Sequence, residues 1–311
     1  MEPEPFRIAV IGDIHLYYND WDTKFFNQSN YDLLLFVGDL GVLTNPKLCL
    51  PIAERLSGLE KPSLMIPGNH DVHNSFQIIA EGLQNRLLAR ISGFSHVRFH
   101  HQLKAVLEPV ILGGYSVHPI CRGITRFDVI AARPYGMGGS SLSYRPLQKK
   151  LFRVRDIEES SQRLCRLVDE AESGNIIFLA HNGPYGISDS PVDIWGCDFD
   201  PSRGDFGDRD LTAAIQHAGN SGKNILAVIA GHMHLQTFLG PKPKTKRRGD
   251  PGPLRPWHVK KDGILYINAA RVPRIYKEGE EEIHHHLSLV LSDHQVEVKE
   301  KLIQSEYLEV E

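Results

Sequence analysis

Short groups of Asp, Asn and His residues recur along the chain, and such side chains can hold metal ions. Asp13 and His15 are separated by one residue and follow an apolar run. In extended backbone, alternate side chains point the same way, so a carboxylate and an imidazole can share one ion. Four other apolar runs end in comparable residues, namely Asp39, Asn69 with His70, His181, and His232 with His234. One buried histidine is ordinary in a protein core, but five such groups in equivalent places indicate a common site.

These donors indicate a pair of transition-metal ions and a hydrolytic reaction. Hydrolysis of a phosphoester needs an activated water, neutralised charge on the phosphoryl oxygens and help for the leaving group. Two cations about 3.5–4 Å apart generate a hydroxide and clamp the transferring group. A pair that close needs an anionic bridge, and we select Asp39 for that role. Imidazole, carboxylate and amide donors favour Mn, with Fe or Zn as alternatives, over Ca.

The elements that must position these residues alternate between strands and helices. Five apolar runs predict buried strands at 7–11, 33–37, 63–66, 176–180 and 225–230. Each run ends next to one of the candidate groups. In open α/β sheets, ligands gather at the carboxyl ends of the strands. We therefore expect the five groups to meet at one rim.

Other segments fill in the pattern. Helices are predicted at 21–26, 46–59, 75–91, 156–172 and 210–218. Ser75 and Asp210 are the candidate N-caps of two of these helices. The pattern also predicts two strands within 97–113 and closing strands at 263–269 and 287–302. His284, His285 and His286 precede an alternating apolar stretch, so we interpret them as strand residues rather than a metal site.

The totals restrict the architecture and the class of partner. The chain has 311 residues and a formal net charge of −3. We expect a single domain over 1–311, with loop inserts at about 121–155, 183–209 and 240–261. The near-neutral charge predicts neither a membrane nor a nucleic acid as partner. The oligomeric state is left open.

The cellular setting is predicted from the cysteines and from the N-terminal residues. Four cysteines are widely spaced and form no CxxC pair, which is typical of thiols in a reducing compartment. The first residues are acidic and carry no secretory pattern, and no apolar stretch is long enough to span a bilayer. We expect a cytoplasmic protein, or one of the plastid stroma if a transit peptide has been removed.

Taken together, the motifs resemble the calcineurin-like metallophosphoesterase superfamily. The family pattern is Asp-x-His, Gly-Asp, Gly-Asn-His-Asp/Glu, a lone His and Gly-His-x-His. It corresponds in the same order to Asp13 and His15, Gly38-Asp39, Gly68-Asn69-His70-Asp71, His181, and Gly231-His232-Met233-His234. The resemblance implies an α/β fold, a four-layer αββα sandwich with two mixed β-sheets.

The resemblance also implies a role for each matching residue. One metal ion would be held by Asp13, His15 and His234, and the second by Asn69, His181 and His232, with Asp39 as the bridge. His70 would not be a ligand but would stabilise the transition state or protonate the leaving oxygen. Asp71 would either orient a histidine or serve a capping or turn role.

One departure from the family pattern narrows the expected function. Protein Ser/Thr phosphatases of the superfamily carry Gly-Asp-x-Val-Asp-Arg-Gly, whereas Gly38-Asp39 is followed here by Leu-Gly-Val. The chain resembles instead the small-substrate phosphodiesterases and phosphatases, including a cyanobacterial and plant branch. We expect hydrolysis of a phosphodiester or phosphomonoester of a small molecule such as a nucleotide. The alternatives are a non-enzymatic scaffold with the same fold and a nuclease of the superfamily.

Because that Arg is missing, a cation that grips the phosphate must come from elsewhere. Arg133 precedes a glycine-rich run, where backbone N–H groups and a guanidinium could bind phosphate; the alternative is a plain long loop. Asn182 directly follows His181 and is a second candidate substrate contact. We interpret the basic cluster at 242–248 as a solvated surface loop rather than a nucleic-acid surface.

Overall fold

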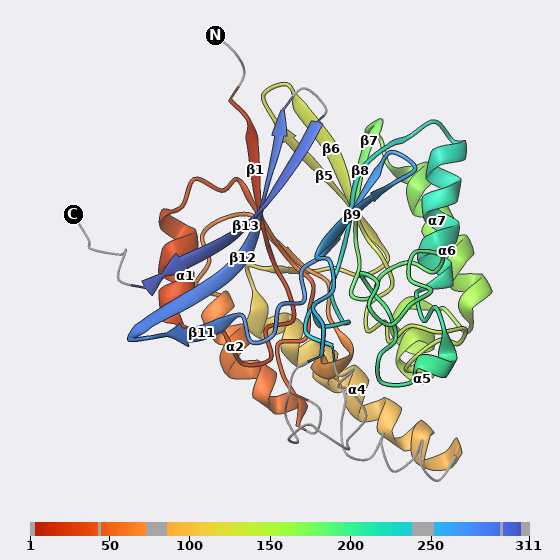
Figure 1. Cartoon of the computed structure of the whole chain (residues 1–311). Coiled ribbons are helices and arrows are strands. Elements are labelled where there is room, and N and C mark those ends of the chain that lie inside the picture. The colour runs from red at the N-terminus through yellow and green to blue at the C-terminus, as the bar shows by residue number, and fades with distance from the viewer. Residues whose placement is uncertain (1–3, 43–44, 73–85, 238–251, 293–294, 306–311) are drawn as a thin grey trace.

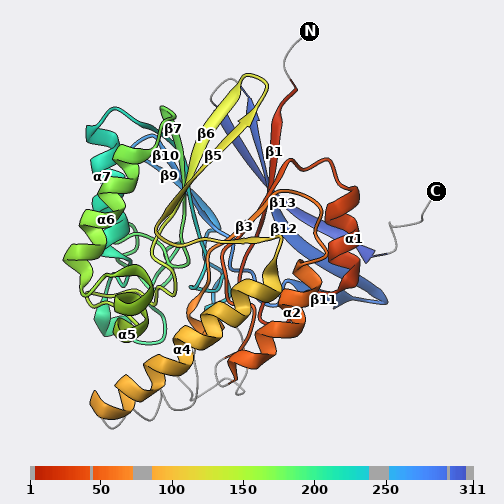
Figure 2. The same cartoon turned by 180° about the vertical axis from the view of Figure 1, so that it is seen from behind.

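Two β-sheets lie face to face, and helices cover both outer sides (Figures 1 and 2). The computed structural model describes residues 4–42, 45–72, 86–237, 252–292 and 295–305. Within the described residues, seven strands form one sheet and six strands form the other. The arrangement is an α/β sandwich with two mixed sheets, which confirms the predicted fold class.

The first sheet has the order β11-β12-β1-β2-β3-β4, and β13 pairs with β12. Its parallel part consists of β1 (Phe6–Ile11), β2 (Leu33–Phe36), β3 (Ser63–Met65) and β4 (Ile111–Leu112). Its antiparallel part consists of β11 (Ile275–Glu278), β12 (Glu281–Ser292) and β13 (Gln295–Gln304). The histidine triplet lies within β12, so its predicted strand structure is confirmed.

The second sheet has the order β5-β6-β7-β8-β10-β9. Its parallel strands are β6 (Thr125–Ala131), β7 (Asn175–Leu179), β8 (Asn224–Ala230) and β10 (Ile264–Asn268). The antiparallel edges are β5 (Ser116–Arg122) and β9 (His258–Lys261). Each of the five strands predicted to end next to a candidate ligand is present in one sheet or the other.

The helices form the two outer layers. α1 (Asp20–Gln28), α2 (Cys49–Leu56) and α4 (Arg86–Leu107) lie on the side of the first sheet, and α6 (Ile157–Glu170) and α7 (Arg209–Asn220) on the side of the second. A short helix α5 (Arg145–Leu147) lies below them. Among the described residues, no helix combines the length and the apolar character needed to cross a membrane.

The pleat of β1 shows how the layers are held together. Ile8 and Val10 belong to the core cluster shared with the second sheet, whereas Ala9 and Ile11 belong to the cluster beneath α1 and α2. All four are fully or almost fully buried. Successive side chains of a strand point to opposite faces, so a strand covered on both faces must be apolar throughout.

The predicted strands within 97–113 are wrong except at β4. Residues up to Leu107 belong to α4, where Phe99, Leu103 and Leu107 are buried at a spacing of four residues. That spacing marks one face of a helix. The valines and aromatic residues of this segment favoured strands, but packing against the sheet decided otherwise. The predicted helix from Ser75 lies mostly outside the described residues.

All three predicted loop inserts contain some helical or strand structure, with the least in 183–209. Within 121–155, β6 forms a hairpin with β5, and residues from Arg145 to Phe152 are helical. The glycine-rich run after Arg133 is the irregular part of that segment. In 240–261, residues 258–261 form β9, while the basic cluster lies outside the described residues. The segment 183–209 contains turns and one short 3-10 helix, Pro201–Arg203.

Candidate metal centre

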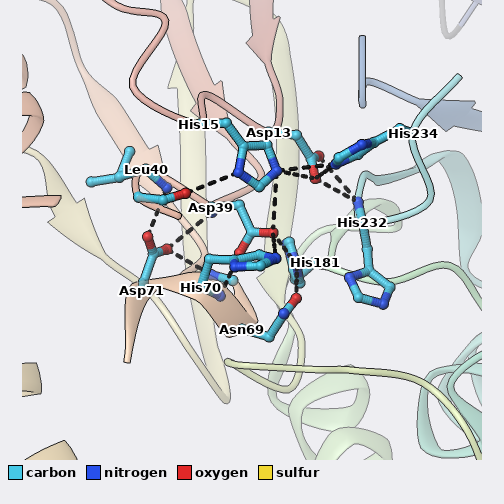
Figure 3. A network of polar contacts seen from close by, with 12 residues as sticks. Asp13, His15, Asp39, Leu40, Asn69, His70, Asp71, His181, His232 and His234 are labelled. Atoms are coloured by element: carbon cyan, nitrogen blue, oxygen red, sulfur yellow. Dashed lines mark hydrogen bonds and ion pairs between the residues drawn. The ribbon is translucent and has the colours of Figure 1, made fainter. Parts of the chain in front are cut away.

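The candidate ligands meet between the two sheets, at the carboxyl ends of five strands (Figure 3). Asp13 and His15 follow β1, Asp39 follows β2, and Asn69 follows β3. His181 follows β7 of the other sheet, and His232 and His234 follow β8. The five groups come together as predicted. They follow strands of two sheets, however, and not of a single one.

The local backbone at Asp13 and His15 is not the extended backbone that the sequence suggested. Their φ angles are 43° and 42°, in the left-handed region. The turn is held against the next loop, since His15 N donates to Asp39 O at 2.7 Å. Asp39 and His232 also have positive φ angles, 52° and 69°. Such backbone costs of order 1–3 kcal/mol per residue and persists where surrounding structure enforces it, as at functional sites.

The first cluster of donors consists of Asp13, His15 and His234, whose ligand atoms all lie within 4.8 Å of one another. The Nε2 atoms of His15 and His234 are 3.0 Å apart. They lie 3.9 and 3.8 Å from Asp13 Oδ1. His15 Nδ1 is 2.9 Å from Gly41 O, which directs the Nε2 lone pair toward the cluster.

The second cluster consists of Asp39, His181 and His232. His181 Nε2 lies 3.4 Å from Asp39 Oδ2 and 2.9 Å from Asn69 Oδ1, while Nδ1 lies 2.6 Å from Val37 O. The same Asp39 oxygen is 3.7 Å from His15 Nε2. Asp39 therefore borders both clusters, which is where a bridging carboxylate must lie.

Two glycines allow this close approach. A Cβ on Gly68 would lie 2.2 Å from Asp39 Oδ1, and a Cβ on Gly231 would lie 2.0 Å from Asp13 Oδ2. No real Cβ tolerates such distances. The glycines before Asn69 and His232 are therefore required by the packing of neighbouring carboxylates against the backbone.

His70 and Asp71 follow Asn69 in a short 3-10 helix, Asn69–Asp71. His70 Nε2 lies 3.8 Å from Asp39 Oδ2, and the side chain is 15% exposed. Asp71 is fully buried and accepts from the backbone N–H groups of Asp39 (3.0 Å), Leu40 (2.7 Å) and Gly68 (2.8 Å). Of its two predicted roles, the structure supports the turn role, because Asp71 joins the loops after β2 and β3.

Burial controls the charges at the site. It raises the pKa of Asp13 to about 8. Burial would lower the pKa of His181, but the neighbouring Asp39 carboxylate raises it to about 10. Burial would likewise raise the pKa of Asp39, but His181 and His70 hold it well below its usual range. Burial lowers the pKa of His15 and His232, and that of His234 to about 4. The neutral imidazoles of His15, His232 and His234 could bind divalent cations directly, whereas Asp13 and His181 would have to release protons first.

The structure contradicts the predicted role of Arg133 in phosphate binding. Its side chain is 1% exposed and is held by two carboxylates, with Nε 2.8 Å from Asp210 Oδ2 and an Nη 2.6 Å from Asp208 Oδ1. Asp210 was also predicted to be an N-cap, but Asp208 is the residue that precedes α7. A buried ion pair between distant segments leaves no local pattern in the sequence.

Asn182 lies next to His181, as predicted, and is completely buried. Its Nδ2 is 3.3 Å from Phe206 O and 3.3 Å from Asp208 Oδ1. Its Oδ1 has no hydrogen-bond partner among the described residues. The side chain therefore belongs to the Arg133 and Asp208 network, and its contact with substrate stays a prediction.

Sequence reasoning missed two buried residues next to the centre, Arg255 and Asn268. Both donate to backbone carbonyls of the turn that carries His232 and His234. For Asn268 a signal was present, because it is the last residue of β10 and so ends a parallel strand in the same way as the candidate ligands. Arg255 lies in a proline-rich segment and has no such pattern around it.

Comparisons with known proteins bear on the family and on the fold. Residues 6–236 match the sequence model of the calcineurin-like phosphoesterases. The fold is similar to that of TT1561 of Thermus thermophilus, at 12% identity over 95% of this chain and 98% of that one, with a TM-score of 0.51. It is also similar to a dimetal phosphatase from Danio rerio, at 11% identity over 97% and 100%, with a TM-score of 0.51. No curated protein matches the sequence significantly.

Proposed function

Because the chain belongs to the calcineurin-like phosphoesterase family, and is thus a metal-dependent phosphoric ester hydrolase, we propose that it cleaves a phosphate ester of a small molecule with two divalent cations. Manganese is the ion we propose, from the mixture of imidazole and oxygen donors. The observation that carries the proposal is the position of Asp39 between two clusters of donors. When bound, the cations supply an activated water and neutralise the phosphoryl oxygens.

The proposed ligands divide between the clusters. Asp13, His15 and His234 hold one cation, and Asn69, His181 and His232 hold the other, with Asp39 between them. The lowered pKa of His15, His232 and His234 keeps these imidazoles neutral and ready to bind. The carbonyl contacts of His15 and His181 fix which ring nitrogen faces the centre.

His70 is the proposed catalytic residue. Its ring lies 5.0 Å from that of His15, at the edge of the donor clusters. Its Nδ1 makes no hydrogen bond with a described residue, although it is buried. A partly exposed imidazole beside Asp39 can donate a proton to the departing oxygen or stabilise the charge on the transferring group.

Metal content and turnover together test this function. We expect the purified protein to hold two transition-metal ions per chain and to hydrolyse bis-p-nitrophenyl phosphate or p-nitrophenyl phosphate with added Mn. The faster of the two substrates distinguishes diester from monoester chemistry. His70→Ala should keep both ions and lose most turnover, about 100-fold or more, whereas Asp39→Asn should lose both ions and turnover. Full activity in either variant would contradict the assigned roles.

A further inference from the structure

Asn268 connects the turn of the metal centre to the segment 183–209. This completely buried residue ends β10, beside β8. Its amide Nδ2 donates to Met233 O at 2.8 Å and to Ile194 O at 2.7 Å. Its Oδ1 accepts from Ala270 N at 2.9 Å, which fixes the orientation of the amide. One side chain thus holds a peptide group between two proposed ligands and a peptide group of the insert.

Arg255 makes a second connection between the same two segments. Its guanidinium donates to His234 O on one side, and on the other to Gly196 O at 2.7 Å and Pro191 O at 3.2 Å. Its Nη2 also lies 3.0 Å from Asp198 Oδ2, and both side chains are nearly completely buried. A planar guanidinium presents donors on three separate nitrogens in fixed directions, so Arg255 reaches three carbonyls from Nε, Nη1 and Nη2, whereas the three donors of an ammonium all lie on one nitrogen.

The other hydrogen bonds of the turn mostly hold its N–H groups, since His232 N donates to the Asp13 carboxylate at 3.1 Å and Gly231 N donates to His181 O at 2.8 Å. Beyond β8 the chain leaves the sheet, and His232 adopts a φ of 69°. Within the turn, Met233 N donates to Gly231 O at 2.9 Å, and Leu235 N donates to Ala270 O at 2.9 Å. The carbonyls of Met233 and His234 are the groups that Asn268 and Arg255 bind. Without these donors, buried carbonyls would lack partners and the turn could relax.

We propose that Arg255 and Asn268 are positioning residues of the metal centre, with Arg255 setting His234 toward the cation that it shares with Asp13 and His15. The segment 183–209 then helps to position the centre, because Arg255 and Asn268 each bind carbonyls of that segment as well as carbonyls of the turn. The proposal rests on the proposed function, since it needs a cation at His234. Groups that orient ligands typically change metal affinity 10- to 100-fold when they are removed.

The test is the affinity of each cation in Arg255→Lys, which keeps the charge but loses the fork of donors. Titration of the metal-free protein with MnCl2, followed by calorimetry and electron paramagnetic resonance, should show two binding steps in the wild type. In the variant we expect one step to weaken about 10- to 100-fold, the other to stay unchanged, and the signal of the coupled ion pair to develop only at correspondingly higher MnCl2. Arg271→Lys is the matched control, because that arginine pairs with Glu300 at 2.8 Å and is 33% exposed.

The outcomes separate the two proposals. Two wild-type affinities in Arg255→Lys, or equal weakening of both steps, would overturn the positioning role, because the first shows no effect and the second shows general loosening. Wild-type protein that binds no ions would instead refute the proposed function. Thermal unfolding without metal checks that the variants fold. If Arg255→Lys does not fold, Asn268→Ser carries the same test, because it removes the amide donors while keeping a small polar side chain.

Discussion

Replacing Gly231 with alanine would place a methyl group where a carboxylate oxygen already lies. The new Cβ would be 2.0 Å from Asp13 Oδ2 and 2.8 Å from Val37 Cγ2. Real contacts of this kind are at least about 3 Å, so Asp13 must move by about 1 Å. The φ of Gly231 is not in the left-handed region, so the clash alone produces the effect.

The expected consequences are a loss of turnover and a loss of stability of similar size in free energy. A shift of about 1 Å in a reacting group typically costs about 100-fold in rate, or about 2.7 kcal/mol of transition-state stabilisation. Overpacking of this kind destabilises the fold by about 1–3 kcal/mol. The assays are kcat/KM with Mn for the first effect and urea unfolding of the metal-free protein for the second.

Gly219→Ala is the matched control. Gly219 lies within α7, and a Cβ there would meet nothing within 4 Å. Alanine in a helix is favoured over glycine by about 0.5–1 kcal/mol, so this variant should be slightly more stable and fully active. The reasoning about Gly231 would be refuted if Gly231→Ala kept wild-type kcat/KM and two bound ions.

Three further predictions concern buried charges. Although burial acts against it, Arg274 lowers the pKa of Asp22 to about 2. The ionised carboxylate therefore contributes about 2.5 kcal/mol of stability above pH 4, and this contribution is lost as the pH falls from about 4 to 2. In urea unfolding, the stability difference between wild type and Asp22→Asn should shrink over that range. Arg133→Leu leaves two carboxylates unpaired and should destabilise the protein by about 3–5 kcal/mol in urea unfolding; wild-type stability would contradict this. The pKa of His181 is raised to about 10 and that of Asp13 to about 8, so both groups hold protons at pH 7 without metal. The affinity for Mn should therefore rise with pH. Calorimetry in buffers of different ionisation enthalpy should show that protons are released when Mn binds.

The strands of the centre were predictable because their residues act locally. Apolar runs covered on both faces, such as 33–37, end in a polar residue that the sheet cannot bury without a partner. The same reasoning extended to Asn268 would have identified it. The segment 97–113 was harder, because Val97 and Phe99 favour a strand while the spacing of Phe99, Leu103 and Leu107 favours a helix.

Ion pairs between distant segments and left-handed backbone conformations could not be predicted from the sequence. Arg133 looked like a phosphate ligand because glycines follow it, but carboxylates 75 and 77 residues further on bury it. The left-handed turn at Asp13 and His15 is held by hydrogen bonds that His15 N and Leu16 N donate to carbonyls of the loop after β2. The extended backbone expected for Asp-x-His was therefore wrong, although the two side chains do lie in one cluster of possible donors.

The origin of the proposed ligands in two different sheets has a thermodynamic consequence. By our proposal, a cation held by Asp39 and His181 would tie the end of β2 to the end of β7, which are far apart in sequence, so the unfolded chain has no preformed place for it. Ion binding must then favour the native state by mass action, by about 2.7 kcal/mol when free metal is about 100-fold above its dissociation constant. The ions would add to the hydrophobic core that already joins the two sheets, so chelation would lower the free energy of unfolding as well as stop catalysis.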